Sequence, residues 1–409
     1  MPSEVNEKLQ TQLSEPSHVR AAPSHPDPYP YYARLAVQKP LFREEQSGAW
    51  VAASAAMVKS VLMNDDCRTR PFYEPVPGSI EGTAMAEIFR YLVRMNDGEN
   101  HRRDRGAVAA SLQGICTGQV VSLAKNMATE LTDLIEPKRN AEQLTRFMFS
   151  LPAFVIGALL GIPREKIEAV AHWVGDYSAA ATAAVTGVPL LDAKLIQTGS
   201  HAASQLLVVF RMMLEALDKN SGTLLALQHR KAQQMGNYDA NAVIANGIGY
   251  MAQGCVACST VIGNTLLALS RNTAIQAKVD RNPTLLANVV QEVLRCDPTT
   301  HSTLRFVSRD TAIAGQKMQQ GDTIIVLLAA ASRDPTLNPE PNVFDIFRPN
   351  RKYLEFSVGS HACPGVEVAT LVAEAAIKHL LDIGLDVEGL ADHVSYRASA
   401  HVRIPIFNC

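Results

Sequence analysis

The chain has 409 residues, of which 47% are apolar and 19% are charged, and its formal net charge is −2. This composition supplies a large apolar core and excludes an intrinsically disordered protein. The small net charge gives no reason to expect nucleic acid or an anionic membrane as a partner.

The cysteine content predicts a reducing compartment. The chain has seven cysteines, an odd number, at the scattered positions Cys67, Cys116, Cys255, Cys258, Cys296, Cys363 and Cys409. Such spacing in a long chain is not typical of a disulfide-stabilised secreted domain. We therefore expect a cytoplasmic protein.

The N-terminal segment is polar. Met1 to Ser24 contains Pro and Ser and lacks the apolar core of a signal peptide or a membrane anchor. We expect residues 1–25 to form a flexible tail. No repeat, low-complexity tract or clear linker divides the remainder, so residues 26–409 are expected to form a single domain.

The first part of this domain mixes helices with extended segments. Asp27 to Leu35 contains prolines at its start and predicts a helix. Apolar and polar residues alternate in Pro40 to Ala53, and Ser47-Gly48 in its middle is a turn signal. This pattern predicts a β-hairpin. The apolar residues of Ala55 to Met63 are spaced as on one face of a helix, so a helix is predicted there. Cys67 to Thr83 is rich in Pro and Gly, which predicts a long loop.

The middle of the chain has helical periodicity. It runs from Ala84 to about Met235, with turn signals at Asp97-Gly98, Gly161-Ile162-Pro163, Gly187-Val188-Pro189 and Asn220-Ser221-Gly222. Asn241 to Ser270 is a long apolar stretch that contains Tyr250 and Gln253. These polar side chains favour a buried helix over a membrane span.

Extended segments return near the C-terminus. Helical spacing continues to Arg295 and ends at Asp297-Pro298. The remaining predicted elements are a strand at Thr323–Leu328, a coil at Pro335–Pro349, a helix at Val366–Ile383 and short strands near Val402–Phe407. The fold class is therefore mainly α with a minor β region.

The segment Phe356–Gly365 has the composition of a binding loop. Cys363 precedes Pro364, and an apolar-periodic helix follows. This order predicts that Cys363 is the N-cap of that helix, where free N–H groups and the helix dipole favour a thiolate. Gly359 and Gly365 would allow the backbone to pass close to a flat group.

The same loop resembles the haem loop of the cytochrome P-450 family, Phe-x-x-Gly-x-His/Arg-x-Cys-x-Gly. The matching residues are Phe356, Gly359, His361, Cys363 and Gly365, and Ser357 replaces the glycine that usually follows the phenylalanine. The resemblance implies a haem b cofactor with Cys363 as the axial thiolate of the iron. It also implies a helix-rich triangular prism with one catalytic domain over residues 26–409. A thiolate ligand favours cleavage of the O–O bond.

A second motif of the family precedes the loop. Glu292 and Arg295 lie three residues apart and share one helical face. Taken alone, such a pair is usually a surface ion pair. In the family, a Glu-x-x-Arg pair braces the segment before the haem loop, and Ser332–Pro335 and Phe344–Arg348 resemble the stretches that it holds. The resemblance implies a structural role for both residues.

Four residues match the family's ligands for the haem propionates. They are His101 and Arg105, four residues apart on one predicted helix, together with Arg305 and His361. Two buried carboxylates need charge-assisted donors of this kind. Arg102 and Arg103, by contrast, are best interpreted as a solvated charge run.

The central helix departs from the family. It usually carries a glycine followed by an acid and an alcohol that help deliver protons. Aligning Gly254 with that glycine places Val256 at the acid and Ala257 at the alcohol, and neither can pass a proton. Cys258 comes next. Cys255-x-x-Cys258 has no second Cys or His pair nearby, so lining a pocket is a better interpretation than binding zinc.

The resemblance implies a monooxygenase that oxidises a medium-sized, natural-product-like organic substrate with dioxygen. Electrons would come from ferredoxin and ferredoxin reductase, and protons from the substrate or water. Neither nucleic acid nor a membrane is expected as a partner. The substrate pocket is expected from Cys67–Leu92, Phe147–Gln228, Gly254–Cys258, Thr299–Leu304 and Ala398–His401.

Two alternatives stay open. A P-450-fold enzyme that uses peroxide, or that catalyses isomerisation, dehydration or reduction, would account for Val256 and Ala257. A non-catalytic haem-binding sensor is a third hypothesis, although such a protein would be expected to carry a signalling domain.

Overall fold

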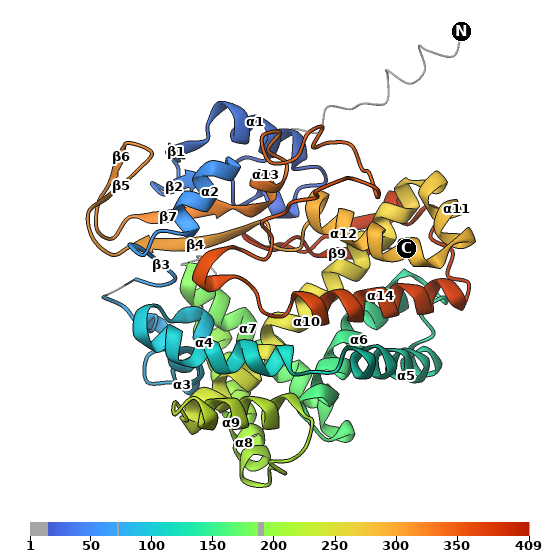
Figure 1. Cartoon of the computed structure of the whole chain (residues 1–409), viewed down its shortest axis with the longest axis horizontal. Coiled ribbons are helices and arrows are strands. Elements are labelled where there is room, and N and C mark those ends of the chain that lie inside the picture. The colour runs from blue at the N-terminus through green and yellow to red at the C-terminus, as the bar shows by residue number, and fades with distance from the viewer. Residues whose placement is uncertain (1–14, 72, 187–191, 409) are drawn as a thin grey trace.

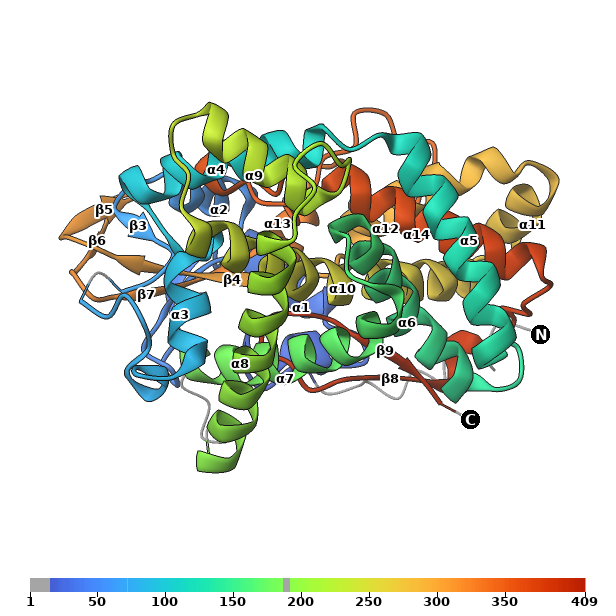
Figure 2. The ribbon, with the colours of Figure 1, turned by 90° about the horizontal axis from the view of Figure 1, so that it is seen from below.

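A computed structural model describes residues 15–71, 73–186 and 192–408. Helices make up most of the molecule, and most of the strands gather at one side, apart from the short pair β8-β9. In both views, β3, β5 and β6 occupy one end, and α5 and α11 occupy the opposite end (Figures 1 and 2). The predicted class, mainly α with a minor β region, is confirmed.

The described chain up to Gln234 contains nine of the α-helices. Their bounds are α1 Tyr29–Gln38, α2 Ala55–Leu62, α3 Ala84–Tyr91, α4 Gly98–Gln113, α5 Thr117–Ile135, α6 Ala141–Leu160, α7 Ile167–Thr186, α8 Ala193–Glu215 and α9 Leu224–Gln234. The second half adds α10 Ala240–Arg271, α11 Thr273–Arg281, α12 Leu286–Cys296, α13 Leu328–Ser332 and α14 Val366–Asp382.

Short strands form one larger sheet and two hairpins. Their bounds are β1 Leu41–Arg43, β2 Trp50–Ala52, β3 Cys67–Arg68, β4 Ser302–Val307, β5 Thr311–Ile313, β6 Gln316–Met318, β7 Thr323–Leu327, β8 Val394–Tyr396 and β9 Pro405–Phe407. The sheet has the order β1-β2-β7-β4-β3, and β2 pairs in parallel with β7, Val51 opposite Ile325. Segments from both ends of the chain therefore share one sheet.

Helix α10 lies at the centre of the helical part. Asp239 caps its N-terminus by accepting a hydrogen bond from the amide of Asn241 at 2.9 Å. The helix packs against α3, α6, α8, α12 and α14. Both α6 and α10 are long and apolar enough to cross a membrane, but 67% and 61% of their apolar windows are buried inside the protein. The interpretation of Asn241–Ser270 as a buried helix agrees with this packing.

Residues 15–25, the described part of the N-terminal segment, contact the body of the protein. The Val19 side chain is 1% exposed, and its amide donates to Glu44 Oε1 at 3.1 Å. Arg403 donates to the carbonyls of Pro23 at 3.1 Å and His25 at 2.6 Å. The Arg403 contacts span almost the whole chain. The polar composition of residues 15–25 does not predict them.

Most predicted boundaries agree with the structure within a few residues. The Ser47-Gly48 hairpin joins β1 and β2, and Gly48 has a positive φ of 68°. The predicted loop Cys67–Thr83 also contains β3, and the predicted strand Thr323–Leu328 stops at Leu327, because Leu328 begins α13. The predicted break at Gly187–Pro189 lies outside the described residues.

Candidate functional site

The loop Phe356–Gly365 is closed by its own backbone. The amide of Cys363 donates to the carbonyl of Phe356 at 2.7 Å, and the amide of Gly365 donates to Cys363 Sγ at 3.4 Å. The N-cap of α14 is Gly365, so the prediction that Cys363 is the N-cap is wrong by two residues. The turn at Pro364-Gly365 nevertheless directs the Gly365 amide at Cys363 Sγ. A backbone N–H group that stabilises the thiolate is what the predicted N-cap position was expected to supply.

The Cys363 side chain keeps exposed surface within a densely packed region. Its residue is exposed, yet burial by the surrounding protein is the strongest influence on its pKa, which it raises. The Gly365 amide and the charge of Arg105 act in the opposite direction and lower that pKa. A cysteine sulfur that is exposed on one side and packed by protein on the other can act as a ligand for a large group that binds on the exposed side.

Two residues of the loop have left-handed backbone conformations. Gly359 has a φ of 74°, and a Cβ there would lie 2.8 Å from Met63 Sδ, so glycine is required on two grounds. Ser357 has a φ of 60°, and its buried hydroxyl has no hydrogen-bond partner among the described residues. The residue that departs from the family pattern therefore occupies a position where glycine would be favourable.

Substitution Ser357→Gly is expected to stabilise the protein by about 1 kcal/mol, because the left-handed conformation costs a side-chain-bearing residue roughly 1–2 kcal/mol. Thermal unfolding of the two proteins checks this. Ser360→Gly is the matched control, since Ser360 is exposed and has no positive φ. It should leave the midpoint unchanged or lower it. An equal or lower midpoint for Ser357→Gly would contradict the prediction.

Asp97 and two histidines meet beside this loop. His361 Nε2 lies 3.0 Å from Asp97 Oδ1, and the rings of His101 and His361 lie in contact, tilted by 37° with centroids 4.1 Å apart. Burial tends to raise the pKa of Asp97, but hydrogen bonds from His361 and Thr69 outweigh it and hold that pKa at about 2. Burial, with the charges of His361 and Arg105, lowers the pKa of His101 to about 4.

Two arginines complete the predicted cationic set. Arg105 Nε donates to the Ser360 carbonyl at 3.3 Å, and its Nη2 donates to the Ala362 carbonyl, so α4 holds the loop directly before Cys363 (Figure 1). Arg305 is 4% exposed and donates to the Leu304 carbonyl at 2.8 Å. In the described part of the chain Arg305 has no ion pair, and burial lowers its pKa.

Helix α10 presents small side chains toward this region. Burial and, to a smaller extent, the charge of Cys363 raise the pKa of Cys258 to about 12, so the two thiols influence each other. Val256 and Ala257 precede Cys258 and are half-buried. The hydroxyl of Thr299 approaches the Ala257 carbonyl at 3.4 Å. No side-chain acid or alcohol occupies these two positions, as the sequence predicted.

Gly254 has a packing function. A Cβ at this position would lie 2.6 Å from Ile156 Cδ1, so the absence of a side chain lets α10 approach α6 closely. This glycine therefore has a reason to be present that is independent of any role in the distal pocket. Within the described residues no group of three or more His, Cys, Asp or Glu side chains is placed to hold a metal ion.

Glu292 and Arg295 form the centre of a buried charge network. Both side chains are fully buried, and Arg295 Nη2 donates to Glu292 Oε1 at 2.6 Å. Arg348 and Arg351 also contact this carboxylate, at 3.3 and 2.7 Å. Burial tends to raise the pKa of Glu292, but Arg295 and its other partners hold that pKa below the usual range. The surface ion pair that the spacing alone suggested is thereby excluded.

Sequence reasoning missed Asp97 and Arg351. Asp97 was noted only as a turn residue, and Arg351 lies just past the matched stretch. Their roles depend on contacts between distant segments, and the residue types alone gave no signal of them.

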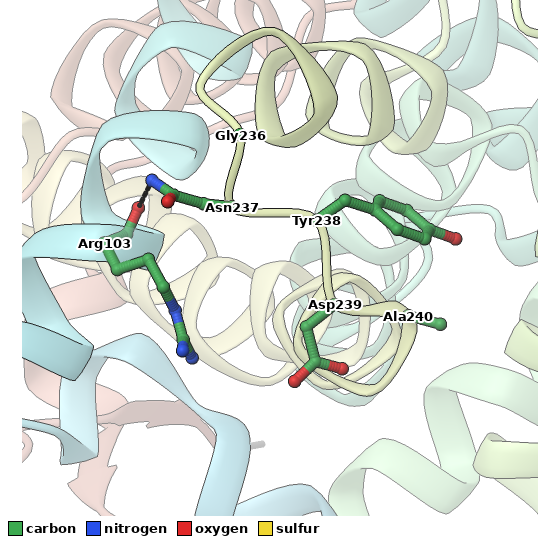
Figure 3. A pocket seen from close by; sticks show the side chains of 6 residues that line it. All are labelled: Arg103, Gly236, Asn237, Tyr238, Asp239 and Ala240. Atoms are coloured by element: carbon green, nitrogen blue, oxygen red, sulfur yellow. Dashed lines mark hydrogen bonds between the residues drawn. The ribbon is translucent and has the colours of Figure 1, made fainter.

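A surface hollow near α4 is distinct from this site. It is lined by Arg103, Gly236, Asn237, Tyr238, Asp239 and Ala240. Figure 3 shows the Asn237 side-chain amide donating to the Arg103 carbonyl, at 3.3 Å. None of the predicted site residues lines this hollow.

The residues of the site fit a haem. Cys363 offers a sulfur with free surface, as a thiolate ligand requires. His101, Arg105 and Arg305 bring donors and positive charge, and Asp97 is the acid among them. Arg305 in particular is a buried cation without an ion-pair partner in the described chain, which a propionate would supply.

Comparisons with known proteins agree with this fit. The family model "Cytochrome P450" matches residues 193–382. The biotin biosynthesis cytochrome P450 of Bacillus subtilis is 25% identical over 87% of this chain and 88% of that protein. The 6-deoxyerythronolide B hydroxylase of Saccharopolyspora erythraea is 26% identical over 93% and 94%.

The fold has a close counterpart among solved structures. The crystal structure of P450BioI in complex with an acyl carrier protein carrying hexadec-9Z-enoic acid matches with a TM-score of 0.78 and 22% identity, covering 93% of this chain and 98% of that one. The chain is therefore similar in sequence to cytochrome P450 proteins and has their fold, and members of that family carry a haem iron held by a cysteine thiolate. The relatives that it matches include a hydroxylase.

Proposed function

We propose that this protein is a cytochrome P450 monooxygenase that oxidises a medium-sized, natural-product-like organic molecule with dioxygen and electrons from a ferredoxin and its reductase. The observation that carries the proposal is the open side of Cys363, with the Gly365 amide directed at its sulfur. The name of the Saccharopolyspora hydroxylase supports a natural-product substrate. All six described cysteines are free, which supports the cytoplasm as the location.

In this proposal each side chain has a defined task. Cys363 binds the iron of haem b, and the haem supplies the redox chemistry of oxygen activation. His101, Arg105, Arg305 and His361 bind the propionates, while Asp97 orients His361 through the 3.0 Å contact. Phe356, Gly359 and Gly365 shape the loop, and Glu292 and Arg295 hold the segment before it.

The residues that would supply protons differ in this chain from the usual pattern of the family. Val256 and Ala257 have no proton to donate, and Ser259, the next hydroxyl along α10, is occupied with the Cys255 carbonyl at 2.7 Å. We propose that a substrate hydroxyl or an ordered water delivers the proton. The same two residues also favour the second candidate, an enzyme that uses peroxide or rearranges its substrate without net electrons.

The test is the coupling of NADPH consumption to product. With a surrogate ferredoxin system and a substrate that lacks a hydroxyl near the oxidised carbon, the wild type should release most of its electrons as peroxide. Ala257→Thr should raise the fraction of product, because it restores an alcohol at the family position. Ala252→Thr, which adds the same group elsewhere on α10, should have no such effect.

Two results would contradict the monooxygenase. Turnover with hydrogen peroxide alone, at the rate reached with NADPH, would favour a peroxide-using enzyme. An isomerised or dehydrated product formed without electron consumption would favour the non-oxygenase reaction.

A further inference from the structure

Glu355 is a buried acid that directly precedes the Phe356–Gly365 loop. The residue is 7% exposed, and its Oε1 accepts a hydrogen bond from the Thr299 amide at 2.8 Å. Its second oxygen, Oε2, is buried and has no hydrogen-bond partner within the described residues. A buried carboxyl oxygen without a partner is uncommon in native proteins and calls for an explanation.

The surroundings of Glu355 favour its protonated form. Burial, aided by the charge of Asp297, raises the pKa of Glu355 to about 8, although hydrogen bonds from Thr299 and from the Thr300 amide lower it. Near neutral pH this carboxyl therefore carries a proton that it can release. An acid whose pKa lies close to the working pH is suited to proton transfer.

Thr299 connects this acid to α10. Its side chain is 2% exposed, and its hydroxyl donates to the Ala257 carbonyl at 3.4 Å. The Thr299 amide is held by Glu355, and its carbonyl accepts a hydrogen bond from the Arg403 amide at 2.9 Å. Because its backbone is bonded on both sides, the Thr299 hydroxyl has a fixed place beside α10.

Ala257 is the position at which α10 lacks the alcohol of the family pattern. Val256, one residue earlier, stands in place of the acid, and both residues are half-buried. An alcohol and an acid nevertheless meet here, because Thr299 and Glu355 come from two other segments of the chain. The sequence motifs gave no signal of Glu355.

We propose that Thr299 and Glu355 replace the alcohol and the acid that α10 lacks, and that they supply protons to an ordered water beside Ala257. The proposal rests on the proposed monooxygenase and specifies one of its two proton sources. The Glu355 carboxyl gives its proton to Thr299 Oγ1 while the Thr299 hydroxyl gives its own proton to the water. The resulting carboxylate regains a proton from bulk water through its remaining exposed surface.

Glu355 has a second route by which it could influence the site. The charge of Glu355 raises the pKa of Cys363 and that of Tyr353. Ionisation of Glu355 could therefore act on the iron through its thiolate ligand, without Thr299. Removal of the Thr299 hydroxyl separates the two routes, because it interrupts only the first.

The experiment uses carbon monoxide as the probe on the reduced, haem-loaded protein and records the infrared C–O stretching band. A hydrogen-bond donor beside bound carbon monoxide polarises it and lowers the frequency of the band. In the wild type the band should move to higher frequency as the pH rises through about 8. Once Glu355 is ionised, the Thr299 hydroxyl is expected to turn towards the carboxylate and away from the pocket.

Three variants test the two residues separately. Thr299→Val should hold the band at the higher frequency at every pH, whereas Thr299→Ser should behave as the wild type does. Glu355→Gln keeps an oxygen that can accept from the Thr299 amide but has no ionisable proton, so its band should not depend on pH. Adding Ala257→Thr to Thr299→Val should return the band to lower frequency, because it restores a hydroxyl on α10.

Two matched substitutions are the controls. Thr265→Val removes another buried hydroxyl, which donates to the Val261 carbonyl of α10 at 2.7 Å. Glu374→Gln removes a half-buried carboxyl on α14 whose pKa burial also raises. Both variants should keep the position of the wild-type band and its dependence on pH.

Three outcomes would overturn the proposal. They are a wild-type band that does not change with pH, a Thr299→Val band that matches the wild type, and a pH dependence that persists in Thr299→Val, which would assign the effect of Glu355 to Cys363. Each of these results, obtained with a thiolate-type ferrous–carbonyl spectrum, leaves the proposed function intact. Absence of that spectrum in the wild type would instead contradict the proposed function.

Discussion

Replacing Cys363 by alanine should abolish the red-shifted Soret band of the ferrous–carbonyl complex and sharply reduce haem content. The sulfur is the ligand that the Phe356–Gly365 loop presents, and its amide partner Gly365 cannot replace it. The measurement is the reduced, carbon monoxide-bound spectrum together with haem per protein. Because the thiol accepts only one hydrogen bond and has free surface, the fold itself should survive the change.

Two other cysteines serve as controls for this experiment. Cys116→Ala removes an exposed free thiol outside the site, and Cys258→Ala removes the thiol on α10 nearest to Cys363. Both variants should keep the thiolate spectrum. An unchanged spectrum in Cys363→Ala, or its loss in Cys258→Ala, would refute the assignment of the axial ligand.

Replacing Glu292 by glutamine should prevent accumulation of folded protein. The carboxylate is contacted by three guanidinium groups, and both Glu292 and Arg295 are fully buried. Removing the negative partner leaves buried positive charge uncompensated, which costs about 3–5 kcal/mol. Native proteins are stable by only about 5–15 kcal/mol in total. Yield of soluble holoprotein and the denaturation midpoint measure the effect.

Glu130→Gln is the matched control for Glu292→Gln. Glu130 pairs with Arg164 at the surface, where the two side chains are 40% and 43% exposed, and such pairs contribute about 0–1 kcal/mol. The control should fold normally. A Glu292→Gln protein that is well folded and haem-replete but inactive would show that Glu292 acts in the chemistry and is not a brace.

The chemistry-bearing loop could be predicted from local sequence. Phe356, Gly359, Cys363 and Gly365 lie within ten consecutive residues, and their backbone closes on itself through the Cys363–Phe356 hydrogen bond. A hydrogen bond between residues only seven positions apart depends on the residues between them, so a motif of ten residues is enough to predict it. The spacing of Glu292 and Arg295 on one helical turn was readable for the same reason, although their burial was not.

The surroundings of the loop were decided by tertiary structure. Asp97 reaches His361, and Arg351 reaches Glu292, only because separate segments pack together. The packing of residues 15–25 against Arg403 joins the two ends of the chain in the same way.

The sequence by itself determined the ligand loop, the helix-rich class and the absence of an acid and an alcohol at Val256 and Ala257. These are properties of consecutive residues or of a regular period, which local hydrogen bonding and apolar spacing fix. Only the tertiary structure decided that Glu292 and Arg295 are fully buried and that Arg348 and Arg351 contact the Glu292 carboxylate. Burial and charge compensation depend on what every other segment places nearby, and no local pattern contains that information.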